Sequence, residues 1–336
     1  MQTTEFFNTI KANDHKPLFT SHFTPAMMMR LMLKRFNSTA TPSTYSSRIN
    51  WKLINPKIFI QHDCDFCQQH FPPDKQVNFA QDLDKSAAIP SKHVMALTTK
   101  HNRIGEFESR IENWLGTLAH EIHKLRFKVP LGSRTLISSI VLHKNDEILR
   151  QFNVKQHNGE QLVFIYPEMK IVKFNIAHTA QFITKYLKSG VEEETEVFNP
   201  FLKPLDISSK RSTKIKVDDR NFQEWHIDRD LIVICGHAKR DIRCGILGPI
   251  LVDKFNEALT AKTIENDAYV GEITHIGGHA FAGNVLYYPK ECTTSLDFIW
   301  YGRVFPDHVE MVVDDTVVHK RIIKGLFRGD NYKYGA

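Results

Sequence analysis

The sequence has few cysteines and no long hydrophobic run. Five Cys among 336 residues is a low and odd number, unlike the dense, even sets of secreted disulfide-stabilised proteins. No stretch approaches the roughly 18 uninterrupted apolar residues of a membrane-spanning helix, so we expect no membrane span. The G-x-S-x-G elbow of hydrolases and the G-x4-G-K-[ST] phosphate loop are also absent. These chemistries therefore leave no motif in the sequence.

Acidic residues are missing from residues 15–62, where basic residues alternate with Met, Leu, Phe, Ser and Thr. This composition is typical of a mitochondrial presequence, which we expect to begin at Met27 and to be cleaved near Arg35–Ser38. We therefore predict a mitochondrial protein, in the matrix, the intermembrane space or both. A disordered basic tail is the alternative.

The charge outside this region is nearly balanced. Net charge is +6, and the first 50 residues hold six Lys or Arg against two acids, so +4 lies there and only +2 in residues 51–336. Such a balance does not favour nucleic-acid binding. With 42% hydrophobic residues, the remainder can form globular cores.

Two cysteines and two histidines form the most informative pattern. Cys235 and Cys244 lie in ICGHAKRDIRCG, and His275 and His279 in THIGGHAFAGN. Two thiols and two imidazoles make a complete ligand set for zinc or an iron–sulfur cluster. Structural zinc sites usually use shorter C-x2-C to C-x4-C pairs, so the wider cysteine loop favours a cluster. The two glycines between the histidines predict a tight loop instead of a helix.

These motifs resemble the sucrase/ferredoxin-like family of thioredoxin-like ferredoxins, over Ile234–Pro249 and Thr274–Val285 and more weakly over Ile299–Pro306 and Leu326–Gly329. The resemblance implies a [2Fe-2S] cofactor held by Cys235, Cys244, His275 and His279. Relatives with four thiolates have C-x3-C where this chain has H-x3-H. The resemblance also implies a part in redox quality control of mitochondrial thiol proteins or in protein import.

The predicted fold class is α/β. We expect a thioredoxin-like ferredoxin domain at residues 226–330, preceded by a second, degenerate thioredoxin-like domain at 51–188, which would serve as a scaffold or docking domain. A presequence-like or disordered segment would occupy residues 1–50 and a linker 189–225. Hydrophobic periodicity predicts one helix over residues 104–125 and others over 178–188, 246–259 and within 307–324. Strands are expected at 94–99, 136–142, 162–166, 171–176, 231–235, 268–274, 284–288 and 298–304.

Other candidate residues surround the quartet or stand apart from it. His237 lies inside the cysteine loop and is expected beside the ligands at most, while Lys239, Arg240 and Arg243 could balance cluster charge or meet an acidic redox partner. Cys64 and Cys67 form a C-x2-C pair flanked by His62 and His70. They could be a redox dithiol, half a zinc site or a surface pair. Cys292 is interpreted as a structural thiol.

The leading hypothesis is a mitochondrial electron-transfer or redox-sensing protein that serves redox partner proteins, which we favour over an enzyme with a substrate of its own. One alternative is a thiol-disulfide oxidoreductase using Cys64/Cys67 or Cys235/Cys244. Another is a zinc-stabilised interaction module.

Overall fold

The computed structural model describes residues 47, 49–57, 70–98, 103–129, 131–132, 134–188 and 215–334. Tyr45–Ala336 forms one compact unit. The predicted presequence with its cleavage site, and the Cys64/Cys67 pair, lie outside the described residues. In the part of the chain that is described, no helix is both long and apolar enough to cross a membrane.

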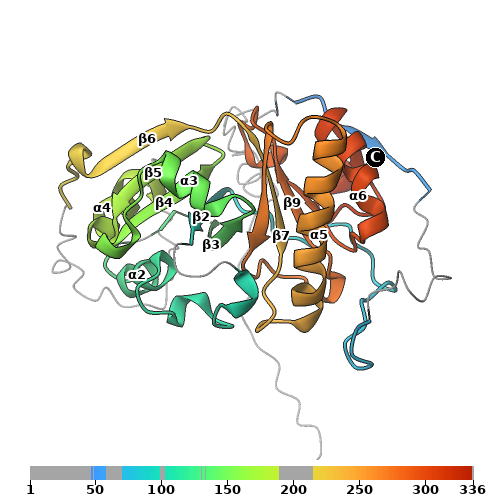
Figure 1. Cartoon of the computed structure of the whole chain (residues 1–336), viewed down its shortest axis with the longest axis horizontal. Coiled ribbons are helices and arrows are strands. Elements are labelled where there is room, and N and C mark those ends of the chain that lie inside the picture. Colours follow the sequence, from blue (N-terminus) through green and yellow to red (C-terminus); the bar gives the residue numbers. More distant parts are fainter. Residues whose placement is uncertain are drawn as a thin grey trace, which may run out of the picture. The chain divides into compact units, whose positions relative to one another are not determined.

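The first half of the described chain has a β-α-β-α-β-β-α order (Figure 1). Its first two strands run parallel, and the third and fourth add antiparallel. The elements are β2 (Lys92–Leu97), α2 (Leu118–Leu125), β3 (Thr135–Leu142), α3 (Asn145–Gln151), β4 (Glu160–Tyr166), β5 (Lys170–Asn175) and α4 (Thr179–Phe182), which a π-helical turn, Ile183–Leu187, continues.

The second half repeats the parallel pair followed by two antiparallel strands and a helix. Its elements are β7 (Asp230–Cys235), α5 (Ile242–Ala261), β8 (Ala268–Ile273), β9 (Val285–Tyr288), β10 (Ile299–Tyr301) and α6 (Val309–Val312), continued by the π-helical turn Val313–Val318. The strand orders β3-β2-β4-β5 and β8-β7-β9-β10 are equivalent, and both are the thioredoxin arrangement. The predicted α/β class, with two thioredoxin-like units, is confirmed.

The strands named above, together with β6, form one nine-stranded sheet, ordered β10-β9-β7-β8-β3-β2-β4-β5-β6. The halves meet where β3 and β8 pair antiparallel, but only at their carboxyl ends, Ile140–Leu142 with Gly271–Ile273. Strand β6 (Phe222–His226), which includes the last residues of the predicted linker, extends β5 at one edge. The predicted domain boundaries remain a prediction. A separate two-stranded sheet pairs β1 (Lys52–Ile54) with β11 (Arg321–Ile323).

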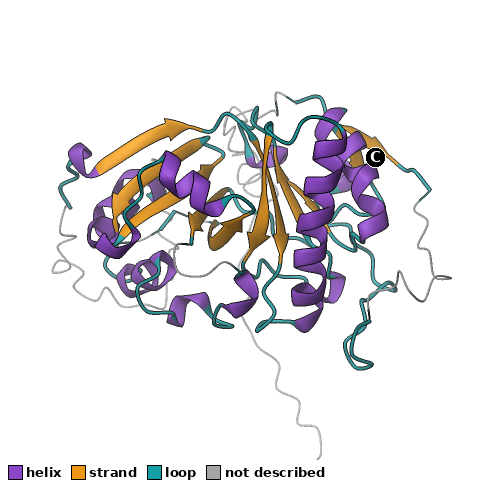
Figure 2. Cartoon of the chain, viewed as in Figure 1, coloured by secondary structure: helices purple, strands orange, loops and turns teal. Residues whose placement is uncertain are grey.

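The sheet bends strongly at the β3–β8 junction. His93 of β2 and Tyr288 of β9 are four strands apart in the sheet order, yet the His93 Nδ1 and Tyr288 Oη atoms are 2.5 Å apart. Phe164 of β4 likewise stacks edge-on against Tyr269 of β8, with ring centroids 5.8 Å apart. The two halves therefore pack inner face to inner face around a shared hydrophobic core. Helices α5 and α6 cover the outer side of the second half (Figure 2).

Two helix predictions need correction. Residues 104–125 do not form one helix: Ile104–Glu106 and Ile111–Asn113 are isolated 3-10 turns, and α2 begins only after Thr117, whose hydroxyl accepts from His120 N–H. The apolar spacing arises because Ile104 and Phe107 pack on Val141 of β3. Helix α5 begins at Ile242, four residues earlier than predicted, because Asp241 caps it.

Further 3-10 turns connect these elements, at Gln156–Asn158, Ile176–His178, Asp219–Asn221, His279–Phe281, Ser295–Asp297, Pro306–His308 and Asn331–Tyr334. The remaining predicted helices and strands are present, with ends shifted by a few residues.

Candidate metal centre

Cys235 and Cys244 meet at the carboxyl end of β7. Cys235 is the last residue of that strand, and Cys244 lies in the first turn of α5, not on a loop as predicted. Both side chains are buried. Helix α5 packs so closely on the cysteine loop that a Cβ atom at Gly248 would lie 2.5 Å from the Cα atom of Gly236. Only glycine permits this approach at position 248. This close packing fixes the two thiols relative to each other.

The two thiols interact directly. A hydrogen bond from the Cys244 thiol lowers the pKa of Cys235 well below its ordinary value against the opposing effect of burial, and the His275 imidazole lowers it further. The pKa of Cys244 is raised, because it shares this hydrogen bond and is buried. The site therefore favours one thiolate, on Cys235, over two protonated thiols.

His275 and His279 stand on the predicted tight loop that follows β8. Between them Gly277 and Gly278 have φ angles of +89° and +72°, a left-handed conformation that favours glycine and excludes a helix. The two imidazole centroids are 5.4 Å apart. The side chain of His279 is 47% exposed, whereas Nδ1 of His275 is buried and has no hydrogen-bond partner among the described residues. His279 thus forms the outward side of the site, the thiols form its buried side, and His275 is partly buried between them.

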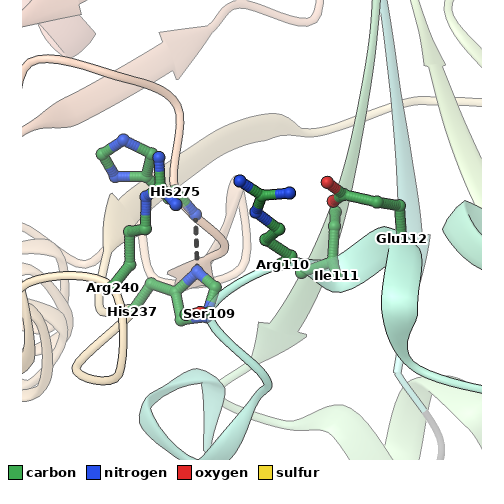
Figure 3. Close-up of a pocket in the computed structure, with 7 residues that line it drawn as sticks. All are labelled: Ser109, Arg110, Ile111, Glu112, His237, Arg240 and His275. Atoms are coloured by element: carbon green, nitrogen blue, oxygen red, sulfur yellow. Dashed lines mark hydrogen bonds between the residues drawn. The ribbon is translucent and has the colours of Figure 1, made fainter.

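His237 links the histidine loop to the first half of the chain. Its Nδ1 accepts the His275 backbone N–H at 3.1 Å (Figure 3), so its Nε2 must carry the proton, which it donates to the carbonyl of Glu108 at 2.9 Å. Burial lowers the pKa of His237 and so favours this neutral form. His237 is therefore a positioning residue in the structure, adjacent to the quartet, as the sequence suggested.

Asp241, the N-cap residue of α5, lies on the His279 side of the site. Asp241 forms two hydrogen bonds with the guanidinium of Arg243, both 2.9 Å, and its Oδ2 lies 4.0 Å from Nε2 of His279. Burial opposes ionisation of Asp241, but Arg243 keeps its pKa below the ordinary value. Arg243 also donates to the carbonyl of Gln76 at 2.7 Å. Asp241 therefore places a negative charge near the His279 ring without a direct hydrogen bond to it.

Arg328 is a buried cation beside the histidine loop. Its side chain donates to Asn284 Oδ1 at 2.6 Å, to the Gly277 carbonyl at 3.3 Å and to two oxygens of Ser86. None of these partners carries a charge. Burial lowers the pKa of Arg328 to about 10, and the nearby cysteines oppose this shift. A buried cation with neutral partners favours negative charge on its neighbours.

The structure brings together all four predicted ligand residues and adds three that sequence reasoning missed. Among the described residues, no group of three His, Cys, Asp or Glu is arranged to hold a single metal ion. The three are Asp241, Arg328 and Glu108. In the sequence, Asp241 could have been found as a typical N-cap residue before a helix, and Arg328 lies in the segment Leu326–Gly329 noted above. No sequence pattern points to the backbone carbonyl of Glu108. Cys292 is buried away from the quartet, with Sγ 3.5 Å from the carbonyl of Thr294.

Comparison with known proteins identifies the family of the chain. The sucrase/ferredoxin-like family matches residues 83–329, most of the chain. The chain belongs to the sucrase/ferredoxin-like family. The predicted resemblance is thereby confirmed, and the match includes both thioredoxin-like halves of the structure, whereas the motifs lie only within residues 234–329.

Relatives in this family carry the name "Altered inheritance of mitochondria protein 32". The protein of that name from Debaryomyces hansenii is 36% identical over 80% of this chain and 92% of its own length. The one from Clavispora lusitaniae is 38% identical over 79% of this chain and 90% of its own. Among solved structures, a thioredoxin-like [2Fe-2S] ferredoxin from Aquifex aeolicus aligns with 30% of this chain and 90% of its own, at 15% identity and a TM-score of 0.24.

Proposed function

We propose that the protein is an electron-transfer protein that binds a [2Fe-2S] cluster through Cys235, Cys244, His275 and His279. The observation that supports the proposal best is that the fold gathers a thiol pair and an imidazole pair from segments 30 residues or more apart in sequence. A two-iron cluster with mixed ligation takes two pairs of donors, instead of three or four side chains around one ion.

The residues present fit such a group. The lowered pKa of Cys235 favours the thiolate that a metal requires. The buried, unpartnered Nδ1 of His275 is a donor atom for which the protein supplies no other partner among the described residues. When bound, a [2Fe-2S] group supplies one-electron transfer at a potential that its ligands and their surroundings set.

The surrounding side chains have separable tasks in this proposal. The buried thiols hold the inner side and exclude water, while the exposed His279 faces the surface where electrons can enter and leave. His237 holds the backbone of His275 in place, and Asp241 supplies a negative charge near His279. The positive charge of Arg328 stabilises the negative charge gained on reduction and so raises the reduction potential. Neutral imidazoles in place of thiolates raise the potential as well.

A mitochondrial location is part of the proposal. The basic, acid-free residues 15–62 support it, and the relatives' name, which refers to the inheritance of mitochondria, is consistent with it. The expected partners are mitochondrial redox proteins, and redox quality control of thiol proteins or protein import remains the proposed setting.

A second candidate is a thiol-disulfide oxidoreductase that uses Cys235 and Cys244. The direct contact between the thiols and the lowered pKa of Cys235 favour it. The two candidates differ in what they require of the histidines, because a dithiol enzyme needs neither imidazole as a ligand.

The deciding experiment is anaerobic purification of the full chain, followed by analysis of iron, acid-labile sulfide and zinc and by absorption spectra before and after dithionite. We expect two irons, two sulfides and a visible band that dithionite bleaches. The double variant His275→Ala/His279→Ala should lose the band, whereas His226→Ala, at an exposed position in β6, should keep it. One zinc and no colour would refute the cluster. Thiol-disulfide activity that survives the double variant would favour the dithiol enzyme.

A further inference from the structure

A polar pocket of about 320 Å³ opens beside the candidate metal centre (Figure 3). Both halves of the chain form it. Ser109, Arg110 and Glu112 come from the segment that precedes α2, whereas His237, Arg240 and His275 come from the cysteine and histidine loops. His275 is thus the proposed ligand that this pocket exposes to approaching molecules.

The pocket carries unpaired positive charge. Within the described part of the chain, the guanidinium groups of Arg110 and Arg240 form no hydrogen bond and no ion pair with another side chain or carbonyl. Neighbouring basic residues differ: Lys239 pairs with Glu108 at 3.2 Å and Arg243 with Asp241 at 2.9 Å. Glu112 is the single carboxylate among the lining residues, so two cations face one anion.

Two free guanidiniums at one pocket are suited to a carboxylate. Arginine presents several donors in a fixed plane, and carboxylate oxygens accept them in pairs. Pockets for free organic ligands are mostly apolar and enclosed. This pocket has one apolar lining residue, Ile111, and both arginines are exposed at its rim. That chemistry fits a carboxylate side chain on another protein's surface better than a small metabolite.

We propose that this pocket is the docking site for an acidic segment of the redox partner, whose carboxylates bind Arg110 and Arg240 and place the partner against the His275 edge of the centre. The proposal rests on the proposed electron-transfer function for its purpose, but the binding itself needs no metal. It also assigns a task to the first half of the chain, which supplies Arg110.

The test uses a fluorescein-labelled peptide of six alternating Glu and Ser residues, with blocked ends, and measures its binding to the full-length protein by fluorescence anisotropy. We expect binding that weakens as ionic strength rises. In the double variant Arg110→Gln/Arg240→Gln, affinity should fall by about tenfold, the effect of losing two partly solvated charge-assisted contacts. Arg150→Gln removes the same charge from an exposed position on α3 and should bind like wild type.

The outcomes separate the inference from the proposed function. Equal affinities in the wild-type protein and the double variant would overturn the docking site. Citrate is the small-molecule competitor. If citrate displaces the peptide and binds more tightly than the peptide does, the choice of a protein partner is overturned and a small-molecule site is indicated. Iron and sulfide analysis of the same preparation reports on the cluster independently. A protein without iron that still binds the peptide through Arg110 and Arg240 would refute the electron-transfer function alone.

Discussion

The two neighbouring glycines of the histidine loop allow a matched test of how that loop is held. Gly277 and Gly278 both have positive φ angles, so replacing either by Ala places a side chain in the left-handed region, at a cost of about 1–2 kcal/mol. They differ in what the new Cβ atom would meet. At Gly277 no heavy atom lies within 4 Å, whereas at Gly278 the Nη2 atom of Arg328 lies at 2.1 Å.

The clash at position 278 is not easily relieved. Arg328 is 1% exposed and is held by hydrogen bonds to Ser86, Asn284 and the Gly277 carbonyl. Either this side chain moves and loses charge-assisted hydrogen bonds, or the loop itself shifts. Overpacking of this kind costs about 1–3 kcal/mol. We therefore expect Gly278→Ala to destabilise the fold by about 2–5 kcal/mol and Gly277→Ala by only about 1–2 kcal/mol.

Urea unfolding of the two variants and the wild-type protein, followed by tryptophan fluorescence, measures both values under one set of conditions. The comparison is internal, because both substitutions add the same methyl group to adjacent left-handed residues. A Gly277→Ala variant as unstable as Gly278→Ala would refute the claim that Arg328 braces the loop. In a metal-loaded protein, Gly278→Ala should also lower cluster content more than Gly277→Ala, because it displaces the segment that carries both histidines.

Three further predictions concern charge. Burial lowers the pKa of His93 to about 3, below its value of 6.5 in the unfolded chain. As pH falls below 6.5 the imidazole is therefore protonated in the unfolded state but not in the folded state, and stability falls. The free energy of unfolding should drop by about 2–3 kcal/mol between pH 6.5 and 4.5. Urea unfolding should show this slope in wild type, and it should be reduced in His93→Gln. His279→Cys should keep a cluster but lower its reduction potential in spectroelectrochemistry, because a thiolate replaces a neutral ligand; an unchanged potential would argue against His279 as a ligand. Arg328→Gln should also lower the potential, and Arg328→Lys should restore much of it if charge is the cause.

Local sequence signals were sufficient for the strands and for the histidine loop. The apolar run 231–235 is buried along its whole length in β7, as a strand covered on both faces requires. Gly277 and Gly278 marked a tight turn because few other residues adopt their backbone conformation. These features depend on residues close together in the chain, so the sequence alone predicted them.

Features that depend on distant contacts could not be predicted in this way. Apolar spacing over residues 104–125 matched a helix, but Ile104 and Phe107 instead pack as loop residues on Val141, a contact that exists only after β3 is in place. Arg328 follows Cys244 by 84 residues and reaches the histidine loop only through the fold. The pairing of β3 with β8, which merges both halves into one sheet, has no local signal either.

Strand register explains why a half without cluster ligands contributes to the centre. One row of paired residues crosses the junction between the halves, in the order Leu97, Ile140, Ile273 and Cys235. The end of β2 is therefore three strand spacings, about 14 Å measured along the sheet, from the cysteine that ends β7. In each half the segment after the first strand starts at this row, so the two segments meet.

The segment of the first half has no cysteine. It contributes hydrogen bonds to residues of the second half that lie beside the ligand loops. The Ile104 N–H donates to the carboxylate of Glu272 at 2.9 Å, and the Glu108 carbonyl accepts from His237. Removing the first half would leave Glu272 and His237 without these partners, at positions adjacent to both ligand loops. Water would then replace these partners, but it would not hold either side chain in a fixed orientation. The geometry of the candidate metal centre thus depends on both halves, and the pocket beside it, which residues of both halves line, could not exist on either half alone.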